Sequence, residues 1–317
     1  MRSGESGALA AAKHLIGDIR IGISGWNYAG WRGVFYPPRL AHKRELAHAS
    51  SVFRTIEING THYSLQRPED FARWAEETPP DFIFAVKGSR YITHMKKLRN
   101  PEAGLANFFA QGILRLGPKL GPILWQFGPN FRFDRTRIEL FLALLPRDTE
   151  AALALARRHD HRVAGRAWLR IDKKRKLRHA MEIRHDSFVH PDFIALLRKY
   201  GVALVSADTV DWPLLMDLTS DFVYCRLHGS EQLYSSGYDA KAIAAWAKRV
   251  AAWAQGGEAP DGQRASARRA PKRARRDVFV YFDNDAKVRA PFDAQALVAR
   301  VEKSLVLARG TAGARTR

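Results

Sequence analysis

Short apolar runs recur eight times along the chain, and most of them close on a glycine or a polar residue. They cover residues 19–25, 55–59, 82–87, 122–127, 179–184, 202–208, 222–228 and 278–283. Most are nearly continuous rather than alternating, which is typical of strands buried on both faces of a parallel sheet. The pattern therefore predicts eight parallel strands.

Helical periodicity fills the intervals between these runs. It is clearest in two sets of residues spaced i, i+3, i+4, i+7, namely Phe193, Leu196, Leu197 and Tyr200, and Ala294, Leu297, Val298 and Val301. A further helix is expected near 212–218, where the pattern is weakest. Strand and helix alternating eight times predict a single (β/α)8 TIM barrel rather than an open doubly wound sheet. We assign the barrel to residues 19–308, with flexible extensions at 1–18 and 309–317.

Positive charge is concentrated in two helix-to-strand intervals. Of the formal net charge of +20, residues 157–178 carry +8 and residues 262–276 carry +7. Such connections lie on the N-terminal face of a barrel, opposite the usual active site. We therefore expect basic insertions near 157–178 and 257–277 to lie away from the site, with 257–276 disordered and more mobile than the barrel. Nucleic acid is a candidate partner for them, although their few aromatic residues favour a solvated charge run.

The composition also bears on the setting of the protein. Cys225 is the only cysteine, so no intrachain disulfide can form. No stretch approaches the roughly 20 apolar residues that a membrane-spanning helix needs. These features predict a cytoplasmic protein that does not associate with membranes. The sequence contains no Walker loop, zinc-binding His-Glu-x-x-His helix or Gly-x-Ser-x-Gly elbow, and we expect neither a cofactor nor a metal.

Polar residues two positions apart close several of the predicted strands. Side chains two apart on a strand share a face, so an outward apolar residue between them leaves both polar partners inside the barrel. The residues placed inside in this way are Glu57 and Asn59, Glu182 and Arg184, Arg226 and His228, and Lys87. Buried charges are costly, and barrel enzymes carry their chemistry at the C-terminal ends of strands. We therefore favour a polar site there over an ion-pair plug.

Several other residues are weaker candidates for the same site. Gln126, Asp208 and Asn284 close strands four, six and eight. Tyr28 and Trp31 belong to an aromatic first loop that can stack on a sugar or a base. His94 can reach the mouth from the third loop, and residues 235–238 form a candidate lid.

Ordered motifs along the chain resemble a known family. They include Gly22–Tyr28, Glu57–Asn59, Phe84–Lys87, Thr93-His94, Gln126, Glu182–His185, Arg226–Gly229 and Tyr281–Asp285. Together they resemble the YecE-like family, a domain of unknown function numbered 72, over roughly residues 19–305. The resemblance implies a TIM barrel and brings no established activity. Two residues depart from the family pattern: His62 stands where phenylalanine is more usual, and Gly128 where a proline often follows.

The leading hypothesis is an enzyme acting on a small anionic or sugar-like substrate as a non-redox hydrolase, lyase or isomerase. Glu57, Glu182 and His228 are then the acid/base candidates. Lys87, Arg184 and Arg226 hold an anionic group. Only two acids, Glu57 and Glu182, face these three cations, and Asp208 is the candidate for a third acid. We therefore expect the empty mouth to bind an anion.

Two alternatives remain open. The first is a metal-dependent phosphoester hydrolase with Glu57, Glu182, Asp208 and His228 as ligands, although the three cations would repel a divalent ion. The second is a non-enzymatic nucleic-acid-binding scaffold that uses the basic segments. The sequence leaves the oligomeric state open.

Overall fold

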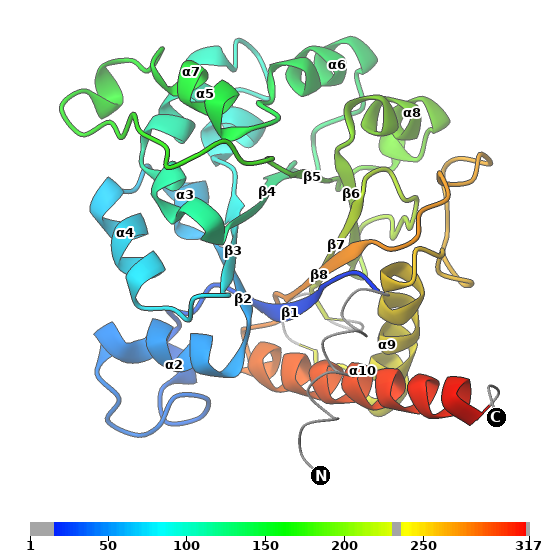
Figure 1. The fold of residues 1–317 in the computed structure, drawn as a ribbon. Helices are drawn as coiled ribbons and strands as arrows, with labels where there is room; N and C mark the ends of the chain where they lie inside the picture. Colours follow the sequence, from blue (N-terminus) through cyan, green and yellow to red (C-terminus); the bar gives the residue numbers. More distant parts are fainter. Residues whose placement is uncertain (1–15, 230–235, 315–317) are drawn as a thin grey trace.

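Eight parallel strands close into a barrel in the computed structural model, which describes residues 16–229 and 236–314 (Figure 1). Each strand pairs with its neighbours in the chain, and β8 pairs with β1. The strands are β1 Ile19–Ser24, β2 Thr55–Ile58, β3 Ile83–Lys87, β4 Leu120–Gln126, β5 His179–Glu182, β6 Ala203–Asp208, β7 Phe222–Leu227 and β8 Asp277–Phe282. The expected (β/α)8 fold is confirmed.

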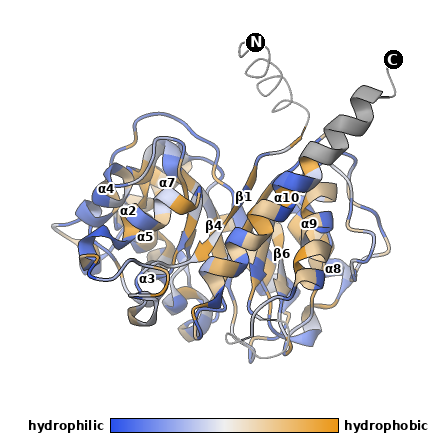
Figure 2. Cartoon of the chain, turned by 90° about the horizontal axis from the view of Figure 1, so that it is seen from below, coloured by the Kyte–Doolittle hydropathy of each residue, from blue (hydrophilic) through white to orange (hydrophobic). Residues whose placement is uncertain are grey.

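Helices surround the barrel and cover the outer face of its strands (Figures 1 and 2). They are α2 Glu45–Val52, α3 Gly60–Tyr63, α4 Pro68–Glu76, α5 Glu102–Ala110, α6 Arg135–Leu144, α7 Thr149–Ala156, α8 Pro191–Tyr200, α9 Ala240–Ala254 and α10 Arg289–Ala314. Helices α9 and α10 pack against each other and against β8, and α10 also packs against β1. None of the helices described is long and apolar enough to cross a membrane.

Side chains alternate between the inside of the barrel and the helix layer. The inner cluster consists of Ala85, Leu124, Ala180, Ala203, Val205, Ala207, Phe222, Tyr224, Phe279 and Tyr281. The intervening strand residues, such as Ile56, Val86 and Met181, pack into the larger core beneath the helices. Because side chains two apart share a face, the inward positions continue at the strand ends with Lys87, Gln126, Glu182, Arg226 and Asp283.

The connection between β6 and β7 departs from the expected pattern. Residues 209–221 form no helix, so the helix predicted near 212–218 is wrong. The backbone N–H of Met216 donates to the carbonyl of Gln263 at 2.8 Å, and the carboxylate of Asp217 accepts from the N–H groups of Ala265 and Ser266. This segment therefore hydrogen-bonds to the distant α9–β8 connection and does not form the internal backbone hydrogen bonds of a helix.

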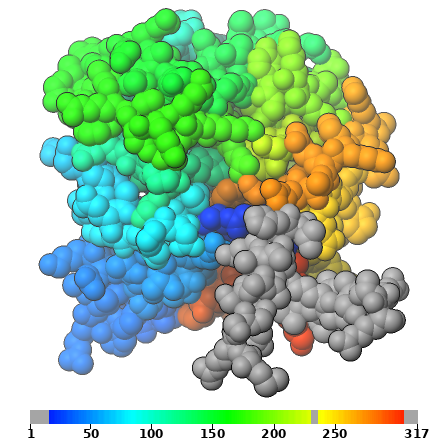
Figure 3. Space-filling model, viewed as in Figure 1, coloured from blue at the N-terminus to red at the C-terminus, as the bar shows by residue number. Residues whose placement is uncertain are grey.

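Both basic segments lie at the N-terminal end of the barrel, and Figure 3 shows them on one face, 157–178 in green and 262–276 in orange. Arg178, just before β5, pairs with Asp277 at the start of β8 at 2.7 Å. The α9–β8 connection follows a defined path, since Arg276 is buried and donates to the carbonyls of Gly257 and Pro271. Its mobility relative to the barrel stays a prediction.

The outer limits of the barrel differ in one respect from the expected ones. Helix α10 continues to Ala314, beyond the boundary expected at residue 308. Residues 1–15, 230–235 and 315–317 lie outside the described part of the chain, and they include Ser235 of the candidate lid at 235–238.

Candidate functional site

A fully buried arginine forms the centre of the polar cluster at the C-terminal ends of the strands. Arg226 on β7 is 0% exposed. Its guanidinium donates to Glu57 Oε1 and Glu182 Oε2, each at 2.9 Å, and to Asp283 Oδ2 at 2.8 Å. Since these carboxylates come from β2, β5 and the end of β8, one guanidinium joins four strands.

The two glutamates of this cluster accept hydrogen bonds from further donors around them. Glu57 also accepts from hydroxyl groups and Glu182 from an amide and a second guanidinium; these donors are Ser24, Tyr224, Gln126 and Arg184. Burial alone would raise the pKa of Glu182, but Arg226 and then Arg184 hold it well below its usual range. Glu182 is therefore a poor proton donor at neutral pH.

Asp283 is an acid of this cluster that was not among the predicted site residues. Its pKa also lies well below the usual range, because Arg226 and His228 outweigh the effect of burial. His228 Nδ1 lies 3.1 Å from Asp283 Oδ2. The expectation of two acids against three cations is therefore wrong, because Asp283 supplies a third carboxylate inside the barrel. Tyr281 lies on the same face of β8 as Asp283, and this spacing of two would have placed Asp283 inside the barrel. The three consecutive polar residues at 283–285 obscure that alternation.

Lys87, at the end of β3, stands apart from the paired charges. It is 6% exposed, yet its ammonium group forms no hydrogen bond or ion pair with any residue that the structure describes. Burial, and next the charge of Arg226, lower the pKa of Lys87 to about 8, although Asp283, Glu57 and Glu182 act in the opposite direction. An unpaired cation of this kind is unfavourable in a core that serves only for packing.

A second lysine shows how the same chain satisfies a buried ammonium group elsewhere. Lys119 is 9% exposed, similar to Lys87. Its Nζ donates to the carbonyls of Ala75 and Thr78, at 2.5 and 2.7 Å, and to Thr78 Oγ1 at 3.1 Å. Lys119 is a structural lysine, and the contrast identifies Lys87 as the exception.

The rim of the mouth is formed partly by the β6–β7 segment that lacks a helix. Trp212 from this segment lies with its ring 3.8 Å from the guanidinium carbon of Arg184, and edge-to-face with His228 at 5.6 Å. Arg184 Nε donates to Glu182 Oε1 at 3.0 Å. Trp212 therefore orients two of the predicted site residues, Arg184 and His228. The sequence did not indicate this role, because it depends on the irregular path of the β6–β7 segment.

His94 reaches the mouth from the loop after β3, as its position predicted. It lies in a π-helical turn, Tyr91–Met95, and its ring meets that of His62 edge to face at 5.2 Å. A Cβ atom at Gly128 would lie 3.1 Å from the His94 ring. The two departures from the family pattern, His62 and Gly128, therefore both lie against His94. Burial foremost lowers the pKa of His94 to about 4 and that of His62 to about 3, with Lys87 contributing to both.

The first loop contributes less than its aromatic residues suggested. Trp31 is 1% exposed and packs against Tyr36 and Phe35, so it is a core residue with no face available for stacking. Tyr28 is half-buried, and its hydroxyl donates to the Ser24 carbonyl at 2.6 Å.

Asp285 adds a titratable group beside this loop. Burial, and next the charge of Asp283, raise its pKa to about 6. Asn59 lies nearby and donates to Ser24 Oγ at 3.1 Å, while its buried Oδ1 has no hydrogen-bond partner among the described residues.

Two predicted site residues point away from the barrel interior. Asp208 Oδ2 accepts from the indole N–H of Trp246 on α9 at 2.9 Å. Asn284 donates to Asp293 on α10 at 2.7 Å. Both follow an inward residue by one position and therefore face the helix layer. Asp208 cannot join Glu57, Glu182 and His228, so the four-ligand metal set is not assembled.

A cleft of about 680 Å³ opens beside the mouth, next to the loops that follow β1 and β2. Its lining includes the aromatic residues Trp26, Tyr28, Tyr63 and Trp74, together with Asn59. Asn59 thus contacts both the cleft and, through Ser24, the buried cluster. Aromatic walls with a few polar groups are typical of pockets for small organic ligands.

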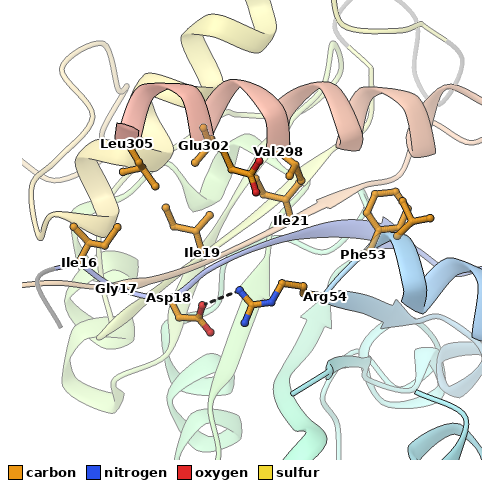
Figure 4. A pocket seen from close by; sticks show the side chains of 12 residues that line it. Ile16, Gly17, Asp18, Ile19, Ile21, Phe53, Arg54, Val298, Glu302 and Leu305 are labelled. Atoms are coloured by element: carbon orange, nitrogen blue, oxygen red, sulfur yellow. Dashed lines mark ion pairs between the residues drawn. The ribbon is translucent and has the colours of Figure 1, made fainter. Parts of the chain in front are cut away.

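A second hollow, of about 500 Å³, lies at the other end of β1 between α10 and α2 (Figure 4). Its walls are mainly apolar, formed by residues such as Ile19, Phe53 and Val298. The charged pair at its edge, Asp18 and Arg54, is exposed. The buried charges converge at the C-terminal mouth, so we place the candidate site there.

Comparisons with known proteins agree with this architecture. A family model described as "Protein of unknown function DUF72" matches residues 20–314. The chain is 31% identical over 118 residues to the UPF0759 protein YunF of Bacillus subtilis, covering 36% of this chain and 41% of that protein. It is 30% identical over 116 residues to the UPF0759 protein YecE of Escherichia coli K12, covering 35% and 40%. The matches thus span about two fifths of these curated relatives.

Solved structures show the same fold. A DUF72 family protein from Thermotoga maritima superimposes with a TM-score of 0.65 at 23% identity, covering 91% of this chain and 99% of that one. A DUF72 family protein from Enterococcus faecalis gives a TM-score of 0.60 at 17% identity, covering 90% and 95%. Since the family model matches almost the whole sequence, the chain belongs to the DUF72 family of proteins of unknown function.

Proposed function

We propose that this chain is an enzyme that binds a small anionic, sugar-like substrate at the C-terminal mouth of the barrel and transforms it by acid/base chemistry. The observation that carries the proposal is the Lys87 ammonium group, which is almost buried and has no partner among the described residues. A bound anion would supply the charge that Lys87 lacks.

The cluster contains separate groups for holding the site and for moving protons. Arg226 pairs with three carboxylates and therefore maintains the architecture. Lys87 and Asp285 have pKa values of about 8 and about 6, on either side of neutrality. Groups that titrate near the working pH are the most effective general acids and bases, so these two replace the glutamates as our first candidates.

The sugar-like character of the substrate is inferred from the neighbouring cleft. Aromatic faces, such as those of Trp26 and Tyr63, suit the apolar faces of a sugar ring, and Asn59 offers an amide to its hydroxyl groups. Arg184, oriented by Trp212 and Glu182, adds a planar donor for an anionic group at the rim.

Nucleic-acid binding is a second candidate, because the two basic segments share one cleft of about 260 Å³. Lys176 comes from the first segment and Arg273 from the second, and Arg147 and Arg198 lie beside them. Four cations around one groove favour the binding of a polyanion. Asp221 pairs with Lys176 and weakens this positive field.

Thermal melting with inorganic phosphate, glucose 6-phosphate and gluconate tests the leading proposal. We expect at least one of them to raise the Tm of the wild-type protein, and Lys87→Met to lose that increase while remaining folded. Lys241→Met, which removes an exposed lysine on α9, is the matched control and should keep it. An increase retained in Lys87→Met, or no increase with any of these compounds, would overturn the proposal.

A further inference from the structure

We propose that Lys87 is an amine nucleophile and that the substrate carries a carbonyl group, with which Lys87 forms a covalent imine. This inference deepens the proposed function and rests on it, because it assumes that a small anionic compound enters the same mouth. It assigns the substrate to the anionic aldehydes and ketones, such as keto acids and the open-chain forms of phosphorylated sugars.

The geometry around Lys87 supports a reactive rather than a structural amine. Lys119, at similar burial, donates to three oxygen atoms of Ala75 and Thr78. Lys87 donates to none among the described residues, so its lone pair becomes available whenever the proton leaves. A desolvated lysine next to another cation is the environment in which lysine acts as a nucleophile, and Arg226 is that cation.

The charged groups facing Lys87 explain why all three carboxylates leave it unpaired. Arg226 binds Glu57, Glu182 and Asp283 at 2.8–2.9 Å and thereby occupies the charges that would otherwise pair with the lysine. His62 and His94 lie on the same side, and their lowered pKa values keep both rings neutral above pH 5. Lys87 therefore lies at the same end of the barrel as three carboxylates, without a direct salt bridge to any of them.

The chemical step is balanced and needs no oxidant or reductant. The Nζ lone pair of the neutral amine forms a bond to the carbonyl carbon, and the carbonyl oxygen takes a proton. The resulting carbinolamine loses its C–O bond, and both original N–H hydrogens leave with the oxygen as one water molecule. The product is a C=N bond, which acts as an electron sink when protonated. Asp285, whose pKa lies near 6, is the candidate for carrying these protons.

Reductive trapping with glyoxylate and sodium cyanoborohydride tests the inference on the full chain. Glyoxylate is a small aldehyde with one carboxylate, and reduction of its imine leaves a carboxymethyl group that peptide mass mapping locates. At pH 8 we expect Lys87 to be modified at least tenfold faster than exposed Lys241, and phosphate to slow modification at Lys87 only. Lys119 provides the buried control and should remain unmodified. Lys87→Arg should retain the circular dichroism spectrum and lose the fast modification; if it does not fold, Lys87→Met replaces it.

The outcomes separate this inference from the proposed function. If phosphate raises the Tm in a Lys87-dependent way but Lys87 is modified no faster than Lys241, the imine is wrong and anion binding stands. If phosphate and the sugar derivatives have no effect on the Tm and Lys87 is not modified, both are wrong. Fast modification of Lys87 that phosphate suppresses supports both.

Discussion

Lys87 and Arg226 lie on the inner face of the same end of the barrel, but all three carboxylates of the cluster pair with Arg226 and none pairs with Lys87. The two cations therefore have different consequences for the protein. Arg226 neutralises charges that would otherwise be buried alone. Lys87 is left with a destabilising charge that only a ligand or the loss of a proton removes.

Substitution of the central arginine should strongly destabilise the fold. Arg226→Gln leaves Glu57, Glu182 and Asp283 without their shared cation, and breaking a buried pair in this way costs about 3–5 kcal/mol. Urea unfolding at pH 7 measures the change in the free energy of unfolding. Arg54→Gln is the control, since the exposed Arg54–Asp81 pair contributes at most about 1 kcal/mol. A loss for Arg226→Gln as small as the control would contradict the assigned role.

Removal of the Lys87 charge should have the opposite effect. The pKa of Lys87 falls from 10.5 to about 8 on folding, and each pKa unit corresponds to about 1.4 kcal/mol. We therefore expect Lys87→Met to raise the free energy of unfolding at pH 7 by about 3 kcal/mol.

The pH dependence of this gain follows from linkage. Below pH 8 both the folded and the unfolded chain hold the proton on Lys87, so the destabilisation is fully present. Between pH 8 and about 10.4 the unfolded chain binds more protons, so wild-type stability rises with pH towards that of Lys87→Met. Urea unfolding at pH 7 and pH 9.5 measures how far the difference in stability between Lys87→Met and the wild type narrows. A variant less stable than the wild type at pH 7 would indicate that Lys87 is part of a structural ion-pair network.

The acidic side of the stability profile should depend on Asp283. Its pKa is depressed in the folded chain, so its stabilising contribution is complete above its unfolded pKa of about 4 and declines as the pH falls below that value. Asp283→Asn removes one such group and should reduce the slope of stability against pH, between pH 2 and 4, by up to about 1.4 kcal/mol per pH unit. Asp81→Asn, at an exposed carboxylate, should change this slope much less. An unchanged slope for Asp283→Asn would contradict the pairing with Arg226.

The basic face permits a test that leaves the barrel intact. Arg268, Lys272 and Arg273 are exposed and form no ion pair with the described residues. If this face binds nucleic acid, changing all three to glutamine should weaken retention of double-stranded DNA and lower the dependence of log K on log salt by up to about 3.

A matched triple substitution on the opposite face serves as the control for the basic face. Lys43, Arg44 and Lys96 are also exposed, and they belong to loops at the C-terminal side of the barrel. Changing them to glutamine should leave DNA binding unaltered. Equal losses in the two triple variants would show that the binding reflects net charge alone.

The strands could be predicted from the sequence because their apolar runs are local signals. Glu57, Lys87, Glu182 and Arg226 could be placed inside because alternation within each strand fixes the side on which a residue lies. Asp208 could not, because β6 has small or apolar residues on both faces and its side-chain alternation is therefore ambiguous. The structure places Asp208 against Trp246, on the helix side.

Features that depend on distant segments were beyond such reasoning. The segment 209–221 obtains backbone partners from Gln263 and Ala265, which its own sequence does not indicate. The unpaired state of Lys87 likewise results from competition with Arg226 for the same carboxylates, which come from three other strands.

The pKa of Lys87, measured with and without phosphate, is the most direct test of the account. Reductive ¹³C-methylation followed by NMR titration reports each lysine, and the spectrum of Lys87→Arg assigns the signal. We expect a pKa of about 8 in the free protein and a rise when phosphate binds, because a nearby anion favours the charged amine. A pKa close to 10.5, unchanged by phosphate, would contradict the claim that Lys87 is a desolvated, unpaired group at a substrate site.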